Sequence, residues 1–400
     1  MSNHEVRMSE WVDRVLPSPT AALESTVAKL QREGQTVHRL GLGQPDFPTP
    51  DRAKQAAIQA IEDNFTGYTD TGGILSLRQA VCDSLRKEMN LSYEPDQIVV
   101  SAGGKQALFN AICTLCREGD EVLIPIPYWV SFPEQVKFAG GKPIFVPTLP
   151  EQGYKTTPET LAPYVNESTR ILILNHPNNP SGAVYSTREL LELAAFCQRN
   201  NLWVISDEVY STFVFTPEKF TSIAAFPGMK ERTVVINAVS KSYSMTGWRI
   251  GYAAAPQAVA QAMLRLQSHT TSNPSSIAQK AALAAIVGPQ NEMEPIHNEY
   301  LARRDYFVEA VRGLQGLECL VPDGAFYVWV DASYWCGRKL LGRMIHSSDD
   351  LAAALLQEAG VAVMPGTGFG SPTHLRLSFA VSRSELESGI AAMEAILGLK

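Results

Sequence analysis

Short apolar runs alternate with amphipathic stretches from about residue 97 onward. Seven of these runs predict β-strands, at residues 97–101, 120–126, 142–148, 170–175, 202–207, 233–240 and 251–255. Several are continuous runs of Val, Ile and Leu, which are typical of strands buried on both faces of a sheet. The amphipathic stretches between them supply the right-handed crossovers that connect parallel strands. The sequence therefore predicts an α/β fold with a doubly wound, mostly parallel, seven-stranded sheet.

The pattern changes beyond about residue 290. A long charged helix is predicted over residues 297–314, followed by strands at 324–331, 361–366 and 374–381. A last helix follows Ser382, and Glu385 stands three residues on, as in a capping box. These elements predict a smaller α+β domain, against which the residues before about Pro45 are expected to pack. We expect a large domain over residues 46–290 and a small domain built from residues 1–45 and 291–400.

Composition and charge disfavour several classes of protein. The 400 residues are 45% hydrophobic and 19% charged, which is ordinary for a globular protein. The formal net charge of -7 comes from 41 acidic and 34 basic residues spread along the chain, so a nucleic acid is not expected as the main partner. No apolar run is long enough to span a membrane, and residues 1–16 lack the apolar core of a secretory signal. We expect a cytoplasmic protein that binds neither nucleic acid nor membranes.

The six cysteines lack the spacing of a disulfide framework and indicate reduced, mostly buried thiols. Cys113 and Cys116 form a C-x-x-C pair, but no second pair or nearby histidine completes a metal site. A half-buried helix face is the preferred interpretation of this pair, with a redox or zinc role as the alternative. We expect no bound metal.

Ligands of open α/β sheets bind beyond the carboxyl ends of the strands. The residues that follow the predicted strands are Gly103, Gly104 and Lys105, then Tyr128, the loop HPNNPSG, Asp207, Glu208 and Tyr210, and Ser240 and Lys241. A glycine turn before a helix suits a phosphate, and a lysine in a crevice can lose its proton and act as a nucleophile. A carboxylate can hold a pyridinium nitrogen protonated. Each feature alone is more simply a tight turn, an exposed strand end or a helix cap, but together they predict a site for pyridoxal 5'-phosphate (PLP).

The motifs at these positions resemble those of the class I (fold type I) aminotransferases, specifically the bacterial-type aspartate aminotransferases. The resemblance extends from about Leu40 to the end of the chain. It rests on LGQPDFPTP, GYTDTGGILSLR, SAGGKQALFNA, PYWVSFPE, NHPNNPSGAVY, ISDEVY, SKSYSMTGWRIGYA, PDGAFYV, GVAVMPGTGFG and HLRLS. It implies the PLP-transferase fold, a homodimer with shared active sites, and a ping-pong exchange of an amino group between an amino acid and a 2-oxo acid.

The resemblance also implies a role for each residue of the cofactor site. Lys241 is similar to the lysine that binds PLP covalently and then moves the Cα proton of the substrate. Asp207 would pair with the pyridine nitrogen, and Tyr210 and Asn179 would contact the phenolic oxygen. Tyr128 would stack on the ring. The phosphate would be held by Gly103, Gly104, Ser240 and Arg249, and by Tyr68 of the partner subunit.

For the substrate, the resemblance implies that Arg376 grips the α-carboxylate, near Asn179 and the backbone of Gly43. Alone, Arg376 reads as a solvated strand residue. Lys105 and Ser18 match positions that bind the side-chain carboxylate in bacterial-type relatives, which indicates aspartate or glutamate as donor and 2-oxoglutarate as acceptor. The arginine that serves this purpose in the animal and enteric enzymes is missing, because its position falls near Ser268.

The chain departs from the family pattern at several positions. It has Leu16, followed by Pro17, where relatives have a lysine before the PSxT motif, and Ala238 where a serine is common. The segment DASYWCGRKLLGRMIHSSDD is long and aromatic, so Tyr334 and Trp335 are candidates to line the entrance of the site. A prephenate or aromatic aminotransferase, a specialised biosynthetic aminotransferase and a PLP β-lyase remain alternatives. A non-enzymatic regulator that senses PLP is disfavoured, since it needs an added basic DNA-binding domain.

Overall fold

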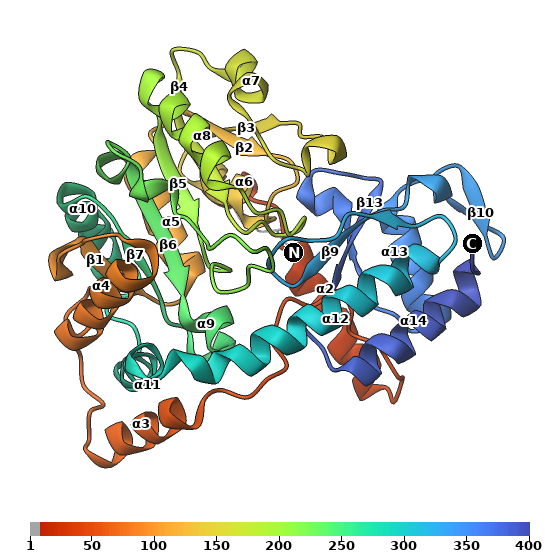
Figure 1. Cartoon of the computed structure of the whole chain (residues 1–400), viewed down its shortest axis with the longest axis horizontal. Helices are drawn as coiled ribbons and strands as arrows, with labels where there is room; N and C mark the ends of the chain where they lie inside the picture. The colour runs from red at the N-terminus through yellow and green to blue at the C-terminus, as the bar shows by residue number, and fades with distance from the viewer. Residues whose placement is uncertain (1–8) are drawn as a thin grey trace, which may run out of the picture.

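The computed structural model describes residues 9–400 and confirms the seven-stranded sheet (Figure 1). The strands are β1 (Ile98–Ser101), β2 (Glu121–Pro125), β3 (Lys142–Val146), β4 (Thr169–Asn175), β5 (Trp203–Asp207), β6 (Thr233–Ala238) and β7 (Gly251–Ala254). Their order is β1-β7-β6-β5-β4-β2-β3. Strands β2 to β6 pair in parallel, and only β7 runs antiparallel to its two neighbours in this sheet. All seven predicted strands are found, and the sheet is mostly parallel.

Helices cover both faces of this sheet, because successive strand residues point to opposite sides. On β4, for example, Ile171 and Ile173 pack on one face and Leu172 and Leu174 on the other. The first face carries α5 (Gly104–Leu115), α6 (Ser131–Phe138) and α10 (Gln257–Ser268). The second carries α4 (Leu75–Met89), α8 (Thr187–Arg199) and α11 (Ser276–Val287), with α3 (Asp51–Glu62) against α11. Both faces are therefore apolar, which is why the strands read as continuous apolar runs.

A smaller antiparallel sheet lies beside the large one and carries the C-terminal helices (Figure 1). It contains β8 (Glu318–Cys319), β9 (Tyr327–Asp331), β12 (Met364–Pro365) and β13 (His374–Ser378), in the order β12-β13-β9-β8. Its helices are α12 (Glu294–Gly313), α13 (Ser348–Ala359) and α14 (Arg383–Leu397). The three predicted strands are present in shortened form. The hairpin β10 (Arg338–Leu340) and β11 (Arg343–Ile345) was not predicted. Three further α-helices are short: α1 (Glu10–Asp13), α7 (Pro158–Leu161) and α9 (Val239–Ser242).

The N-terminal segment contacts the smaller sheet through α2. Helix α2 (Pro19–Arg32) begins after Ser18, whose Oγ accepts a hydrogen bond from the Ala21 N–H. Its residue Val27 belongs to a hydrophobic cluster with Ala362, which precedes β12. The predicted cap of α14 is present in part, because the Glu385 N–H donates to Ser382 Oγ at 3.2 Å. The Glu385 carboxylate does not close a capping box; it accepts from the Arg39 N–H instead and ties this segment to α14.

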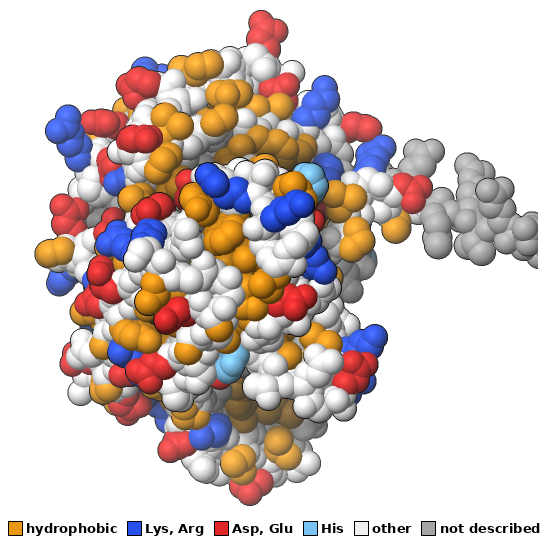
Figure 2. Space-filling model, turned by 90° about the vertical axis from the view of Figure 1, so that its right-hand side faces the viewer, with side chains coloured by type: hydrophobic (Ala, Val, Ile, Leu, Met, Phe, Trp, Pro, Cys, Tyr) orange, Lys and Arg blue, Asp and Glu red, His pale blue; other side chains and the backbone are white. Residues whose placement is uncertain are grey.

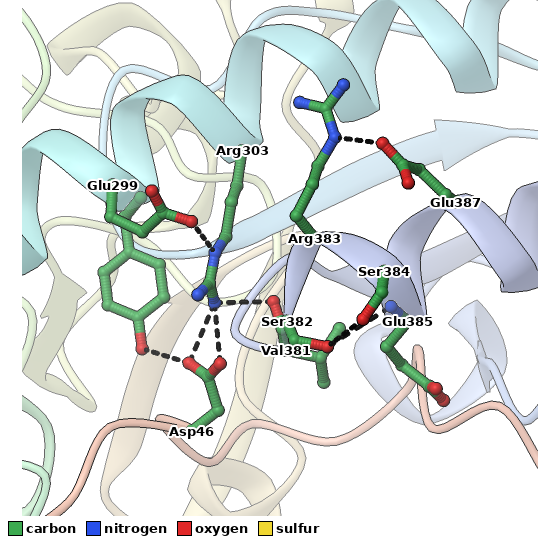
Figure 3. A network of polar contacts seen from close by, with 10 residues as sticks. Asp46, Glu299, Arg303, Val381, Ser382, Arg383, Ser384, Glu385 and Glu387 are labelled. Carbon is green, nitrogen blue, oxygen red and sulfur yellow. Dashed lines mark hydrogen bonds and ion pairs between the residues drawn. The ribbon is translucent and has the colours of Figure 1, made fainter.

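A buried ion pair joins the following segment to α12 (Figure 3). Arg303 Nη1 donates to both carboxylate oxygens of Asp46, at 2.8 and 2.9 Å, and also to the Val381 carbonyl oxygen. Arg303 Nε donates to Glu299 at 2.8 Å. Only 7% of the Arg303 side chain is exposed, and the carboxylates raise its pKa despite that burial. The pair therefore fixes the chain at Asp46, immediately after residues that enter the candidate site.

Surface charge agrees with the sequence-based expectation, because acidic and basic side chains are mixed over the face shown in Figure 2. No helix within residues 9–400 is long and apolar enough to cross a membrane. Cys113 lies on α5 and Cys116 ends that helix, and both thiols are free. Burial raises the pKa of Cys113 to about 12, so its thiol is protonated at neutral pH.

Candidate active site

The large sheet brings the predicted residues to one edge. Strands β4, β5 and β6 end there, at Asn175, Asp207 and Ala238. Strand β7 is antiparallel, so its first residue, Gly251, lies at the same edge, paired with Ser101 and with Ala238. The glycine turn after β1, the lysine after β6 and the arginine before β7 therefore meet, although they are far apart in the sequence.

A cavity of about 320 Å³ opens at this edge, between the large sheet, α2 and the smaller sheet. Ten of the predicted site residues line it: Gly43, Gly104, Lys105, Asn179, Asp207, Tyr210, Ser240, Lys241, Arg249 and Arg376. Gly103, Ser18, Tyr128 and Tyr68 do not line it. Other residues line it as well, among them six to which the sequence gave no role: Thr20, Glu24, Trp129, Asn175, Thr246 and Tyr327.

Lys241 lies on the short helix α9, directly after β6. Its Nζ donates a hydrogen bond to the carbonyl oxygen of Gly43. Burial, and then repulsion from the Arg376 and Arg249 guanidinium groups, lower its pKa to about 8. The uncharged form of this amine, which a nucleophilic or basic lysine requires, is therefore more accessible near neutral pH than in an ordinary lysine, although the protonated form still predominates at pH 7.

Asp207 ends β5, and 6% of the residue is exposed. Burial raises the pKa of its carboxyl group to about 7, against the opposing effects of the Val209 N–H and of Lys241. The Val209 N–H donates to Oδ1 at 3.4 Å, a long hydrogen bond that stabilises the charge weakly. A cationic or N–H group of a ligand in the cavity would therefore be a favourable partner for this carboxylate.

The opposite end of the cavity suits an anion. Gly103 has a φ of +89° and precedes α5, so the helix begins at Gly104 with its N-terminus at the cavity. The Arg249 guanidinium packs so closely on Gly103 that a Cβ atom there would collide with it. Arg249 Nη1 donates to the Thr246 carbonyl at 2.9 Å, and within residues 9–400 no carboxylate pairs with this arginine. Ser240 adds a hydroxyl to the same lining. This arrangement fits a phosphate group.

Arg376 lies on β13 and lines the cavity, and 3% of the residue is exposed, so it is not a solvated strand residue. Its Nη1 donates to Asn179 Oδ1 at 3.0 Å and its Nη2 to the Gly41 carbonyl at 2.7 Å. Its guanidinium stacks over the ring of Tyr327, 4.5 Å from the ring centroid, and its Nε has no partner within the described residues. Because both acceptors are neutral, a carboxylate can replace them with a stronger, charge-assisted pair.

Tyr210 and Tyr327 connect these groups. Their hydroxyl oxygens lie 2.8 Å apart in a hydrogen bond between the two domains expected from the sequence. A Cβ atom at position 43 would collide with the Tyr327 hydroxyl, so a glycine is required there. Gly43 can thereby bring its carbonyl oxygen to Lys241. The sequence indicated Tyr210 but not Tyr327, although the latter stands in the GAFYV motif.

The position of Tyr128 requires a correction. Its ring stacks on Phe145, with centroids 5.0 Å apart and an interplanar angle of 19°, and it does not line the cavity. The adjacent Trp129 lines the cavity instead. The two residues follow β2 in a turn, where neighbouring side chains point in different directions, and the PYW motif alone does not say which ring faces inward. Trp129, not Tyr128, is the ring available for stacking.

Three other predicted positions also differ from the structure. Ser18 caps α2 and lies 2.9 Å from the Thr20 hydroxyl, and it is Thr20 that reaches the cavity. Trp335 does not line the entrance: it is buried in the core of the smaller sheet, where its Nε1 donates to the Gln315 carbonyl. Tyr334 stacks with Arg338 and also lies outside the cavity lining. The aromatic segment therefore serves packing, not the site.

Two predicted residues lie further out. Lys105 is solvent-accessible, and its Nζ sits 5.0 Å from the centroid of the Trp129 ring. Partial burial and the charge of Arg249 lower its pKa, while Glu24 acts in the opposite sense. Tyr68 is 94% exposed in the single chain, so it cannot serve the cavity of its own chain.

The fold and the site define an aminotransferase. The family model of class I and II aminotransferases matches residues 35–393, and the chain belongs to this family. It is 41% identical to the aspartate/prephenate aminotransferase of Nitrosomonas europaea, over 98% of this chain and 100% of that protein. The structure is similar to that of the aspartate aminotransferase of Rhizobium meliloti, with a TM-score of 0.94, 38% identity and coverage of 99% and 100%. It is also similar to that of the Thermus thermophilus aspartate aminotransferase with maleate, with a TM-score of 0.92, 38% identity and coverage of 98% and 100%.

Proposed function

We propose that this enzyme uses PLP and transfers the amino group of aspartate or glutamate to a 2-oxo acid. The observation that carries the proposal is the pairing of Lys241, an amine of lowered pKa, with the buried carboxylate of Asp207 in one cavity. The donors fit the cofactor: Gly104, Ser240 and Arg249 suit its phosphate, and Asp207 suits its ring nitrogen. When bound, PLP supplies an aldehyde for the amine and a ring that withdraws electrons from Cα.

Substrate binding, proton transfer and orientation of the cofactor are assigned to different residues of the chain. Arg376 binds the α-carboxylate and, because β13 holds it rigidly, orients Cα toward Lys241. Lys241 Nζ, in its uncharged form, would accept the proton from Cα of the substrate and pass it to C4′ of the cofactor. Asp207 keeps the ring nitrogen protonated. Trp129 would stack on the ring, and Tyr210 would donate a hydrogen bond to the ring oxygen.

The choice of an acidic substrate rests on Lys105. Burying an unpaired side-chain carboxylate costs several kcal/mol, so a cation must meet it. Lys105 lies at the mouth of the cavity, whereas Ser268 is exposed at the end of α10 and outside the lining. The Thermus thermophilus relative is described with maleate, a four-carbon dicarboxylate of the same size as aspartate. The name of the Nitrosomonas europaea relative favours prephenate, also a dicarboxylate, as a second acceptor.

We further propose that the active unit is a homodimer. The exposed Tyr68 would then complete the phosphate site of the partner subunit. The loop that carries Tyr68 connects α3 and α4, where Ile58, Ile61 and Leu75 are also exposed. Apolar side chains exposed together indicate a surface that another copy of the chain can cover.

A half-reaction screen tests the proposal. The PLP form of the protein is mixed with single amino acids in turn, and conversion to the pyridoxamine form is followed by absorbance. Aspartate and glutamate are expected to convert the cofactor fastest. Lys241→Ala should lose the covalent link and slow the reaction by about 10²-fold or more. Full activity of Lys241→Ala, or no conversion by any amino acid, would overturn the assignment.

A further inference from the structure

Glu24 is one of two carboxylates that line the cavity, beside Lys105, Lys241, Arg249 and Arg376. It lies on α2, one helical turn after Thr20, so both side chains are on the same face of the helix. Leu23 and Val27 adjoin these two residues on the same side of α2 and join the hydrophobic clusters beside β12, so packing fixes the rotation of the helix. A Cβ atom at Gly41 would also touch Leu23. The orientation that points Glu24 toward the cavity is therefore set by the fold.

Electrostatics place Glu24 within range of the substrate site. Its charge acts to raise the pKa values of Lys105, Lys241 and Arg376, the residues expected to meet the distal carboxylate, the cofactor and the α-carboxylate. Within residues 9–400 no cation forms an ion pair with Glu24, whose side chain is exposed. Its charge is therefore not neutralised by a fixed partner. A substrate side chain that reaches Lys105 is therefore also within range of the negative charge of Glu24.

We propose that Glu24 determines specificity: Lys105 and Glu24 present one cation and one anion, not bonded to each other, to the distal group of the substrate, so the site admits carboxamide side chains beside carboxylates. A carboxamide offers an oxygen to Lys105 and two N–H donors to Glu24. A carboxylate offers acceptors only, so its attraction to Lys105 is opposed by Glu24. Specificity of this kind comes from one repulsive and one attractive contact together. The inference rests on the proposed aminotransferase function and on Lys105 binding the distal group.

The test compares isosteric substrates, aspartate with asparagine and glutamate with glutamine, because each pair differs mainly in charge. The measured quantity is the ratio of kcat/KM for the carboxylate to kcat/KM for the amide, at neutral pH with the PLP-loaded enzyme. Glu24→Gln is expected to raise this ratio by about fivefold, a part of the effect of one charge-assisted contact because the site is open to solvent. The increase should shrink at high ionic strength, since salt screens exposed charges. Lys105→Gln should lower the ratio.

Glu33→Gln is the matched control. Glu33 follows the last residue of the same helix and is exposed, but it lies outside the cavity lining. Its replacement by glutamine changes the net charge by the same amount as Glu24→Gln. Its ratio should stay within about twofold of the wild type. An unchanged or lowered ratio in Glu24→Gln, or equal changes in Glu24→Gln and Glu33→Gln, would overturn the role of Glu24.

The outcomes separate this inference from the proposed function. If phenylalanine, alanine and the two substrate pairs all leave the PLP form unchanged, the aminotransferase proposal fails. If the enzyme converts other amino acids but neither substrate pair, the distal site is not a binding site for polar groups and the inference about Glu24 fails alone. If both substrate pairs react, the change in the carboxylate-to-amide ratio of kcat/KM in Glu24→Gln decides whether Glu24 has the proposed role.

Discussion

Replacing Arg303 by methionine should lower the free energy of unfolding more than the loss of an exposed ion pair does. The guanidinium is almost fully buried and donates to Asp46, Glu299 and the Val381 carbonyl (Figure 3). Breaking a buried ion pair typically costs about 3–5 kcal/mol, because the remaining charge is left without a partner. In the folded protein 28% of the Asp46 side chain is exposed, so water can solvate its carboxylate in part. We therefore expect a loss of about 2–3 kcal/mol.

Urea unfolding of the apoenzyme measures this loss, provided that tryptophan fluorescence and circular dichroism give coincident transitions. Arg188→Met is the control, since Arg188 pairs with Glu192 at 3.1 Å with 88% of its side chain exposed. It should cost less than about 0.5 kcal/mol. A double-mutant cycle of Arg303→Met with Asp46→Asn should show a coupling energy of at least about 1 kcal/mol. A coupling below about 0.5 kcal/mol, or equal losses for the two arginines, would refute the reasoning.

The same substitution should affect substrate binding. Asp46 fixes the end of a segment in which the Gly41 carbonyl accepts from Arg376 and the Gly43 carbonyl accepts from Lys241. When the α-carboxylate of a substrate replaces the contact with Gly41, the ion pair with Arg303 still holds this segment in position. Arg303→Met should therefore raise KM for the amino donor more than it lowers kcat. An unchanged KM would show that the segment is held by other contacts.

Four further outcomes follow from the site. Asp207→Ala should weaken PLP binding by about 10-fold or more in equilibrium dialysis, and unchanged affinity would leave Asp207 as a turn residue that accepts from Val209. Covalent attachment of pyridoxal to the apoenzyme should accelerate as the pH rises through about 8, where Lys241 loses its proton, and then level off; acceleration that continues beyond pH 10 would contradict the lowered pKa. Trp129→Ala should reduce PLP affinity more than Tyr128→Ala does, and the reverse order would restore the sequence-based assignment. Hybrids of a Lys241→Ala chain and a Tyr68→Ala chain should recover activity that neither homodimer has, and a monomeric sedimentation profile would exclude shared sites.

The large sheet could be predicted because one physical requirement governs all its strands. Burial on both faces leaves continuous apolar runs such as Ile171–Leu174, and turns or amphipathic helices separate them. The hairpin of β10 and β11 lacks such a signal. Its turn places Leu341 at a φ of +48°, a conformation that a leucine seldom adopts and that its sequence does not indicate. The adjacent Gly342 was the sole local indication of a turn.

Within the site, strand ends were predictable and side-chain directions were not. Asp207 is the last residue of β5 and Lys241 stands three residues after the end of β6, so the topology alone brings them to one edge. Trp129 and Tyr128 lie in a turn, where no periodicity tells which ring faces the cavity. Thr20 and Glu24 come from a helix of the N-terminal segment whose packing partner lies more than 300 residues away in the sequence, beside β12. The i, i+4 spacing of these two residues was the available signal, and it marks a shared face without saying what that face meets.

The charges of the cavity explain why anionic ligands belong there. Four cations line it, namely Lys105, Lys241, Arg249 and Arg376, against two carboxylates, Glu24 and Asp207. Burial raises the pKa of Asp207 to about 7, so this carboxylate is only partly charged and offsets little of the positive charge. The repulsion appears in the lowered pKa of Lys241, whose causes include both Arg376 and Arg249. A phosphate beside Arg249 and a carboxylate beside Arg376 would each relieve part of that repulsion, and so would raise the affinity of Lys241 for a proton. The lysine should therefore become a stronger base when both anions are in place, which couples the proton transfer to a fully loaded site.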